Sequence, residues 1–201
     1  MTLAEEINSV IRTVASSGAG HSVRLSKTFR TRPADLREAI TSPERLARWF
    51  EPVEGELAPG GRYTLTDSGT TGTVESCERP DSLRITWEYG GESSLVRVTL
   101  TPEGDATVLT LVHEVPDNDH WAAYGPGATG IGWESSVRAL STELSTAPGA
   151  VGAEADRPDA DEAAFIDAAA DAWEEAHRAS GASAEQAHRQ ARATAAAYRG
   201  E

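Results

Sequence analysis

The sequence predicts an α+β fold in which one curved antiparallel sheet wraps around a long helix. The first observation is an amphipathic segment near residues 128–146, where Trp133, Val137 and Leu140 recur at helical spacing and form one apolar stripe. The second is that apolar residues follow a period of two between residues 54 and 115, which is typical of strands. The strands come first and the long helix follows them, so the helix has a sheet on which to bury its stripe.

The predicted strands are joined by short turns rich in glycine, proline and aspartate. Consecutive strands connected in this way form an antiparallel meander with one solvated face and one covered face. An earlier strand is expected at 22–31, and the meander contains the inward pair Tyr63 and Leu65 and the alternating segments 83–89, 96–100 and 109–115.

Helices are predicted on both sides of the first strand. Residues 3–14 carry apolar residues at helical spacing, and we expect this helix to dock on the domain or on a partner subunit. After Pro33 two short helices are expected, the second opened by Ser42 as N-cap and Pro43 in the first turn.

The composition changes after the long helix, because residues 150–201 contain 20 alanines and many charges. Helices are predicted near 160–179 and 184–198, with few large apolar side chains between them. Such a hairpin buries too little surface to fold alone. We therefore expect it to pack on the main domain or on a second subunit. Packing on a second subunit would form a homodimer through the terminal helices.

These observations divide the chain into three parts. Residues 1–21 form an N-terminal helix and linker, residues 22–146 form the α+β domain, and residues 147–201 form an alanine-rich helical extension.

The charge and cysteine content exclude several classes of partner. The chain has 32 acidic and 18 basic residues, a formal net charge of -14, and a surface of this kind repels nucleic-acid phosphates and anionic lipids. Cys77 is the only cysteine, which fits a reducing compartment. The start lacks signal-peptide features and no apolar run reaches the length of about 20 residues that spans a bilayer. We expect a cytoplasmic protein with no nucleic-acid partner and no membrane insertion.

Short motifs follow one another in a characteristic order and spacing over about residues 22–146. They are Ser42-Pro43-Glu44-Arg45-Leu46-Ala47-Arg48-Trp49-Phe50, Pro59-Gly60-Gly61-Arg62-Tyr63, Gly72-Thr73-Val74-Glu75, Leu83-Arg84-Ile85-Thr86-Trp87-Glu88, Thr107-Val108-Leu109-Thr110-Leu111-Val112-His113 and Gly132-Trp133. In this order they resemble the motifs of the START-like, or SRPBCC, superfamily, in the branch named after the activator of heat-shock protein 90 ATPase.

The resemblance implies a helix-grip fold of the START and Bet v type, with a bent sheet around a long C-terminal helix. In relatives the cavity between sheet and helix holds lipids, polyketides or hormones. Members include carriers, aromatase/cyclases and receptors, so the fold does not imply one activity. The alanine-rich hairpin is an addition to this fold, and no cofactor is expected.

Strand parity and the helix stripe predict which side chains line such a cavity. An apolar and aromatic wall with a few polar groups describes a small-molecule pocket, and it also describes an ordinary core. The predicted ligand-binding residues are Tyr63, Leu65, Trp87, Tyr89, Val98, Leu111 and His113 from the sheet, Trp133 and Leu140 from the long helix, and Trp49 near the mouth.

His113 is the residue on which the functional alternatives depend. An inward imidazole could bind a ligand carbonyl or act as a general base, and it could also be a structural histidine. The leading hypothesis is binding of a hydrophobic or amphipathic small molecule. The alternatives are a cyclase or dehydratase with His113 as base, and a module that regulates a chaperone-type partner. No metal site is predicted, because His120 and its acidic neighbours are expected in a solvated loop after Pro116 and their spacing fits no zinc pattern.

Overall fold

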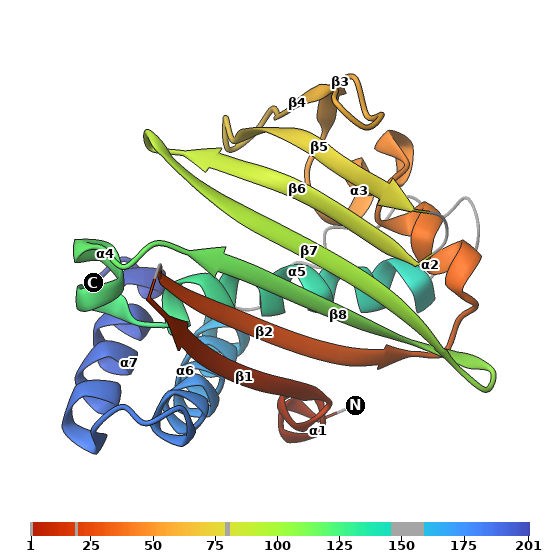
Figure 1. Ribbon diagram of the computed structural model, residues 1–201. Helices are drawn as coiled ribbons and strands as arrows, with labels where there is room; N and C mark the ends of the chain where they lie inside the picture. The colour runs from red at the N-terminus through yellow and green to blue at the C-terminus, as the bar shows by residue number, and fades with distance from the viewer. Residues whose placement is uncertain (1, 19, 79–80, 146–158) are drawn as a thin grey trace. The chain divides into compact units, whose positions relative to one another are not determined.

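The computed structural model describes residues 2–18, 20–78, 81–145 and 159–201. Within these ranges the chain forms a curved, open, eight-stranded sheet in the order β1-β2-β8-β7-β6-β5-β4-β3, as Figure 1 shows. The strands are β1 (Val10–Ser17), β2 (Gly20–Phe29), β3 (Val53–Gly55), β4 (Arg62–Leu65), β5 (Thr71–Glu78), β6 (Ser82–Tyr89), β7 (Glu92–Glu103) and β8 (Ala106–Val115). The helices are α1 (Leu3–Asn8), α2 (Pro33–Ala39), α3 (Pro43–Trp49), α4 (Asp119–Tyr124), α5 (Gly127–Ser145), α6 (Asp159–Ala179) and α7 (Ala184–Arg199). The α+β helix-grip prediction is confirmed.

The chain divides into two compact units. The first unit comprises Met1–Ser26, Glu114–Ser135 and Ala155–Glu201, and the second comprises Lys27–His113 and Ser136–Glu154. The predicted boundaries at 21 and 147 follow sequence composition. The boundary at 147 falls outside the described residues.

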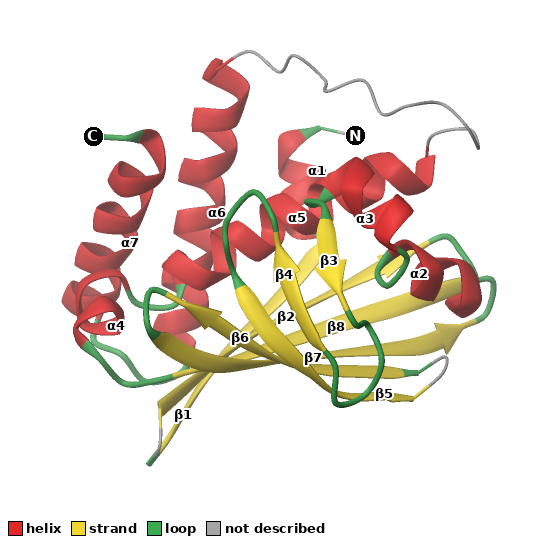
Figure 2. Ribbon diagram, turned by 90° about the horizontal axis from the view of Figure 1, so that it is seen from above, coloured by secondary structure: helices red, strands yellow, loops and turns green. Residues whose placement is uncertain are grey.

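The second unit contains the antiparallel meander that the period of two predicts. Each of the strand pairs β3–β4, β4–β5, β5–β6 and β6–β7 is antiparallel. The parity of β7 is as expected, because Val96, Val98 and Leu100 are buried while Arg97 is exposed. The helices α2 and α3 and the second half of α5 lie on one side of these strands (Figure 2). The second half of the long helix α5 therefore packs on this face of the strands.

A charged network ties α3 to the end of α5 within this unit. The Glu143 carboxylate is buried and accepts from Arg45 Nε at 3.3 Å, with Arg48 at 3.7 Å. Arg45 also pairs with Asp35 of α2 at 2.7 Å. Arg45 of α3 binds carboxylates of both α2 and α5. These charge-assisted hydrogen bonds hold the three helices together over the strands.

In the first unit α6 and α7 form an antiparallel hairpin, at the positions predicted from the sequence. Glu174 of α6 pairs with His188 of α7, and Asp171 pairs with Arg192. The face of α6 that carries Trp173 is buried. Inside this unit α6 contacts α1 and β1, and α7 contacts α4.

The contact between α7 and the segment at 121–128 is made by hydrogen bonds from one face of α7. Gln190 donates to the carbonyls of Trp121 and Ala122, both at 3.0 Å. One turn later Thr194 donates to the Tyr124 carbonyl at 2.8 Å, and after another turn Tyr198 donates to the Ala128 carbonyl at 2.7 Å. Residues four apart lie on one face of a helix, so these three side chains form a polar row beside the buried alanines Ala187, Ala191 and Ala195.

The predicted helix at 3–14 is wrong in its second half. The helix α1 ends at Asn8, and the residues from Val10 onward form strand β1. Val10 and Val14 are buried while Ile11 is 70 % exposed, which is closer to a strand's alternation than to a helical face. Three of the first five residues of β1 are valine or isoleucine, and β-branched side chains favour strands.

The predicted solvated loop after Pro116 also contains regular structure. Asn118 accepts a hydrogen bond from the Trp121 backbone N–H at 2.9 Å and caps the short helix α4. His120 is exposed, as expected, but Trp121 is buried. One turn of helix therefore brings a large aromatic side chain into the core of the first unit.

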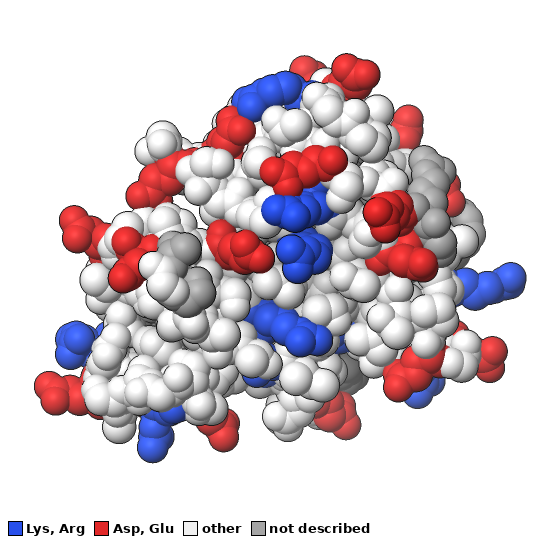
Figure 3. Space-filling model, viewed as in Figure 1, with Lys and Arg blue, Asp and Glu red and all other residues white. Residues whose placement is uncertain are grey.

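Acidic and basic side chains lie next to each other on the surface shown in Figure 3. On the strands of the second unit, Arg62 pairs with Glu88 at 2.8 Å and Arg84 pairs with Glu75 at 2.7 Å. Among the helices that the structure describes, none combines the length and apolar character needed to cross a membrane.

Candidate functional site

Four ring side chains of the second unit form a continuous series, which we call the aromatic row: Trp49, Phe50, Trp87 and His113. Ring centroids are 5.5 Å apart for Trp49 and Phe50, 6.5 Å for Phe50 and Trp87, and 6.1 Å for Trp87 and His113, the last pair edge to face. These spacings are those of favourable aromatic pairs. The row joins the end of α3 to β6 and β8.

The row is fixed at both ends by hydrogen bonds. Trp49 donates its indole N–H to the carbonyl of Ala39 in α2 at 3.0 Å. At the other end, His113 Nε2 lies 2.8 Å from Ser94 Oγ, and Ser94 donates to the Trp87 carbonyl at 3.2 Å. Trp49, Phe50 and Trp87 are only partly buried, whereas His113 is 7 % exposed.

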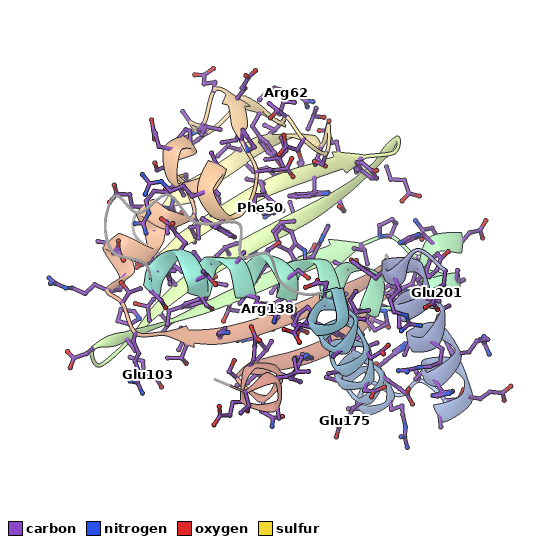
Figure 4. All side chains as sticks on the ribbon, turned by 180° about the vertical axis from the view of Figure 1, so that it is seen from behind. Phe50, Arg62, Glu103, Arg138, Glu175 and Glu201 are labelled. Carbon is purple, nitrogen blue, oxygen red and sulfur yellow. The ribbon has the colours of Figure 1, made fainter. Side chains whose placement is uncertain are left out.

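A small apolar cluster supports the row. Tyr63, Leu65 and Val74 form its buried centre, and Phe50 and Trp87 pack against it. Other partly buried apolar side chains on the cluster are Val53, Leu57, Cys77, Leu83 and Ile85. Phe50, which is labelled in Figure 4, directly follows α3 and connects the aromatic row to this cluster. The centre of the cluster is therefore buried, whereas Phe50 and Trp87 remain partly accessible.

Tyr63 spans from β4 across β5 to β6. Its hydroxyl donates to the Thr86 carbonyl at 2.6 Å, and burial raises the pKa of Tyr63. The ring passes over Gly72, where a Cβ would lie 2.6 Å from the Tyr63 hydroxyl and 2.1 Å from the Thr86 carbonyl oxygen. Glycine is thus required at position 72, and the hydroxyl proton of Tyr63 is already used by the protein.

Burial lowers the pKa of His113 to about 4. At neutral pH the ring is therefore uncharged, because little water is available to solvate the imidazolium. A neutral imidazole beside a serine hydroxyl can exchange hydrogen bonds with a polar ligand group. It is a weak general base, since bases act best when their pKa lies near the working pH.

The structure brings some of the predicted residues together. Trp49, Tyr63, Leu65, Trp87 and His113 belong to the row or its supporting cluster. Val98, Leu111 and Leu140 are buried in the second unit, as parity predicted, and lie outside the contacts that build the row.

Two predicted residues differ from this group. Tyr89 is 63 % exposed, so its expected inward position is wrong. It shares the parity of Trp87, but it is the last residue of β6, next to the Gly90-Gly91 turn. Trp133 lies in the first unit and is half-buried there.

Sequence reasoning missed Ser94, although a signal for it was present. The alternation of Val96, Val98 and Leu100 places residue 94 on the same face when it is extended by two residues. The charged network of Arg45 and Glu143 was also missed, because residues almost 100 positions apart give no local pattern.

The model of the family described as activator of Hsp90 ATPase homolog 1-like protein matches residues 30–145, which is more than half of the chain. The chain belongs to this family. The resemblance to this branch of the START-like superfamily is therefore confirmed. No curated protein sequence matches the chain significantly.

Solved structures share the fold over most of the chain. The crystal structure of CalU16 from Micromonospora echinospora is 28% identical, with a TM-score of 0.61, and the match covers 68% of this chain and 86% of CalU16. The solution structure of the same protein gives 24% identity and a TM-score of 0.70, over 86% of this chain and 97% of CalU16. DynU16, described as a protein in the dynemicin biosynthetic locus, is 26% identical with a TM-score of 0.56, over 62% of this chain and 47% of DynU16.

Proposed function

We propose that the second unit binds a hydrophobic or amphipathic small molecule against the aromatic row. The observation that carries this proposal is the partial exposure of three neighbouring rings. Phe50 lies between Trp49 and Trp87, and Phe50 and Trp87 pack against the buried cluster. Aromatic side chains kept together and incompletely covered are typical of ligand sites.

The polar end of the row gives the ligand an orientation. Ser94 and His113 are the hydroxyl and imidazole at this end. Ser94 donates its proton to the Trp87 carbonyl, so its oxygen remains an acceptor for a ligand. A ligand with an aromatic or aliphatic body and one neutral polar group fits this wall. The pKa of about 4 argues against His113 as the base of a cyclase or dehydratase, so binding is favoured over turnover.

The comparisons support a small-molecule ligand in a second way. DynU16 is described as belonging to a biosynthetic locus, and its similarity to this chain exceeds 25% identity. A ligand related to a biosynthetic intermediate is consistent with this neighbour and with the family.

The proposal is tested by titrating the full-length protein with the fluorescent probe N-phenyl-1-naphthylamine, which is apolar and uncharged at neutral pH. Trp87→Ala removes the ring at the centre of the row, so we expect the probe to bind at least about tenfold more weakly. Tyr89→Ala is the matched control, because it removes an aromatic ring from the same strand at an exposed position.

The control should bind the probe with the affinity of the unchanged protein. Equal affinities for the Trp87→Ala and unchanged proteins would contradict the proposal. Binding of an Hsp90-type partner that depends on Trp87, without any binding of apolar molecules, would favour the interaction module.

A further inference from the structure

Three buried side chains of the first unit, far from the aromatic row in sequence, each leave one polar atom without a hydrogen-bond partner. These atoms are Trp173 Nε1, Gln190 Oε1 and His177 Nδ1; in the described part of this unit the Nε of the only partly buried Arg192 also lacks a partner. The three side chains are 1 %, 1 % and 6 % exposed. A buried polar atom without a partner is costly, and its usual partner is an ordered water or a ligand.

The ion pairs of the hairpin place Trp173 and Gln190 at the same level. Glu174 pairs with His188 and Asp171 pairs with Arg192, so the residues between them on each helix face the same stretch of the other. Trp173 lies between the two acids, and Gln190 lies between the two bases. The unpartnered donor and the unpartnered acceptor therefore come from opposite helices at one level.

The orientation of the Gln190 amide is fixed. Its nitrogen donates to the carbonyls of both Trp121 and Ala122 at 3.0 Å. Exchanging the amide nitrogen and oxygen would place the oxygen against two carbonyl oxygens, so the unpartnered atom is an acceptor. The Trp173 indole can only donate.

Two glycines allow the backbone to lie directly against Gln190 Oε1 and Trp173 Nε1. A Cβ at Gly125 would lie 2.8 Å from Gln190 Oε1, and a Cβ at Gly130 would lie 2.5 Å from Trp173 Nε1. His177 is one turn from Trp173 on α6, and its ring meets the Trp121 ring edge to face at 5.9 Å. The segment 121–130 thus covers these polar groups where α6 and α7 meet.

We propose that a hydroxyl group bridges Trp173 and Gln190, accepting from the indole N–H and donating to the amide oxygen, with His177 as its third neighbour. Water is the smallest molecule with this chemistry, and a small alcohol is the other source. Water has two protons, so it can also donate to His177 Nδ1 and satisfy all three atoms. This second site is polar and is built from residues of the first unit.

The first test is a double-mutant cycle on the full chain, followed by urea unfolding. We expect Trp173→Phe and Gln190→Met to be coupled, because either change removes the bridge. The unfolding constant of the double variant should be at least about tenfold smaller than the product of the single effects predicts. The matched control is Trp173→Phe with Thr194→Val, one turn along the same face of α7, where the effects should multiply within about twofold.

The second test examines the Trp173 indole proton by NMR of the ¹⁵N-labelled unchanged protein, with Gln190→Met as the comparison. A cross-peak to the water resonance that disappears in Gln190→Met identifies water. A cross-peak to a non-water resonance that survives dialysis identifies an alcohol. The proposal is overturned if the indole proton shows neither cross-peak, or if the Trp173 and Gln190 effects are as independent as those of the control.

Discussion

His113 is uncharged because its surroundings are apolar, and this one residue distinguishes a binding site from an acid-base site. Its ring contacts Trp87 and its Nε2 meets Ser94, while its pKa is lowered to about 4 from 6.5 by burial. The lowered pKa of His113 also predicts how the free energy of unfolding depends on pH, because a pKa shift of one unit corresponds to about 1.4 kcal/mol.

The stability contribution of His113 should be lost in mildly acidic solution. The unfolded chain binds the His113 proton below pH of about 6.5, whereas the folded protein resists it until about pH 4. The free energy of unfolding therefore falls as the pH drops through this window. Between pH 7 and pH 4.5 we expect a loss of about 2–3 kcal/mol attributable to this residue.

Urea unfolding of the unchanged protein and of His113→Gln measures this contribution. Carboxylates and the other histidines titrate in both proteins and cancel in the comparison. The variant should lose less stability than the unchanged protein over the same pH range. If both proteins lose the same free energy, His113 is not the buried neutral group that this account requires.

At the scale of single elements, local patterns predicted the parts of the fold that bury a regular apolar face. Alternation located β6, β7 and β8, helical spacing located α5, and the alanine-rich composition located the hairpin of α6 and α7. The failure at 3–14 has a physical cause, since Val10, Ile11 and Val14 fit either period and only strand pairing decides between them. The helix α4 was missed because its single turn depends on a cap and one buried tryptophan.

The candidate site was predicted in part for the same reason. The alternation of residues along β6 and β8 correctly predicted that Trp87 and His113 point inward. Alternation cannot show where the covered part of a strand ends, and it therefore misplaced Tyr89. The polar row of α7 was not predictable, because hydrogen bonds from Gln190 and Thr194 to carbonyls about 70 residues away leave no periodic signal.

The terminal hairpin is required by the elements it contacts in the first unit. A chain that ends at residue 147 lacks the buried Phe165 and Trp173 and the polar row of α7. We expect the truncated protein to melt at a lower temperature than the full chain. Hydrogen exchange should accelerate in α1, β1 and α4, which contact the hairpin.

An unchanged melting temperature and unchanged exchange in these three elements would show that the hairpin is dispensable. Exchange in β5 and β6 serves as an internal control, because these strands pair with each other in the second unit.

At the scale of the whole molecule, charge and family restrict the ligand more than the fold does. The protein carries a net charge of -14 and belongs to a family whose fold serves many purposes. The excess of acidic residues disfavours polyanions, whereas the aromatic row presents apolar rings beside one neutral polar pair. A neutral or weakly polar small molecule satisfies both conditions.

The most direct test of this central claim is native mass spectrometry of the freshly purified protein, followed by organic extraction of whatever it carries. The Trp87→Ala variant, purified in parallel, shows whether retention depends on the aromatic row. We predict a mass excess on the unchanged protein that is reduced in the variant, and an apolar or amphipathic molecule in the extract. An apo mass for both proteins, with no apolar molecule retained after addition of a lipid and polyketide extract, would contradict the account.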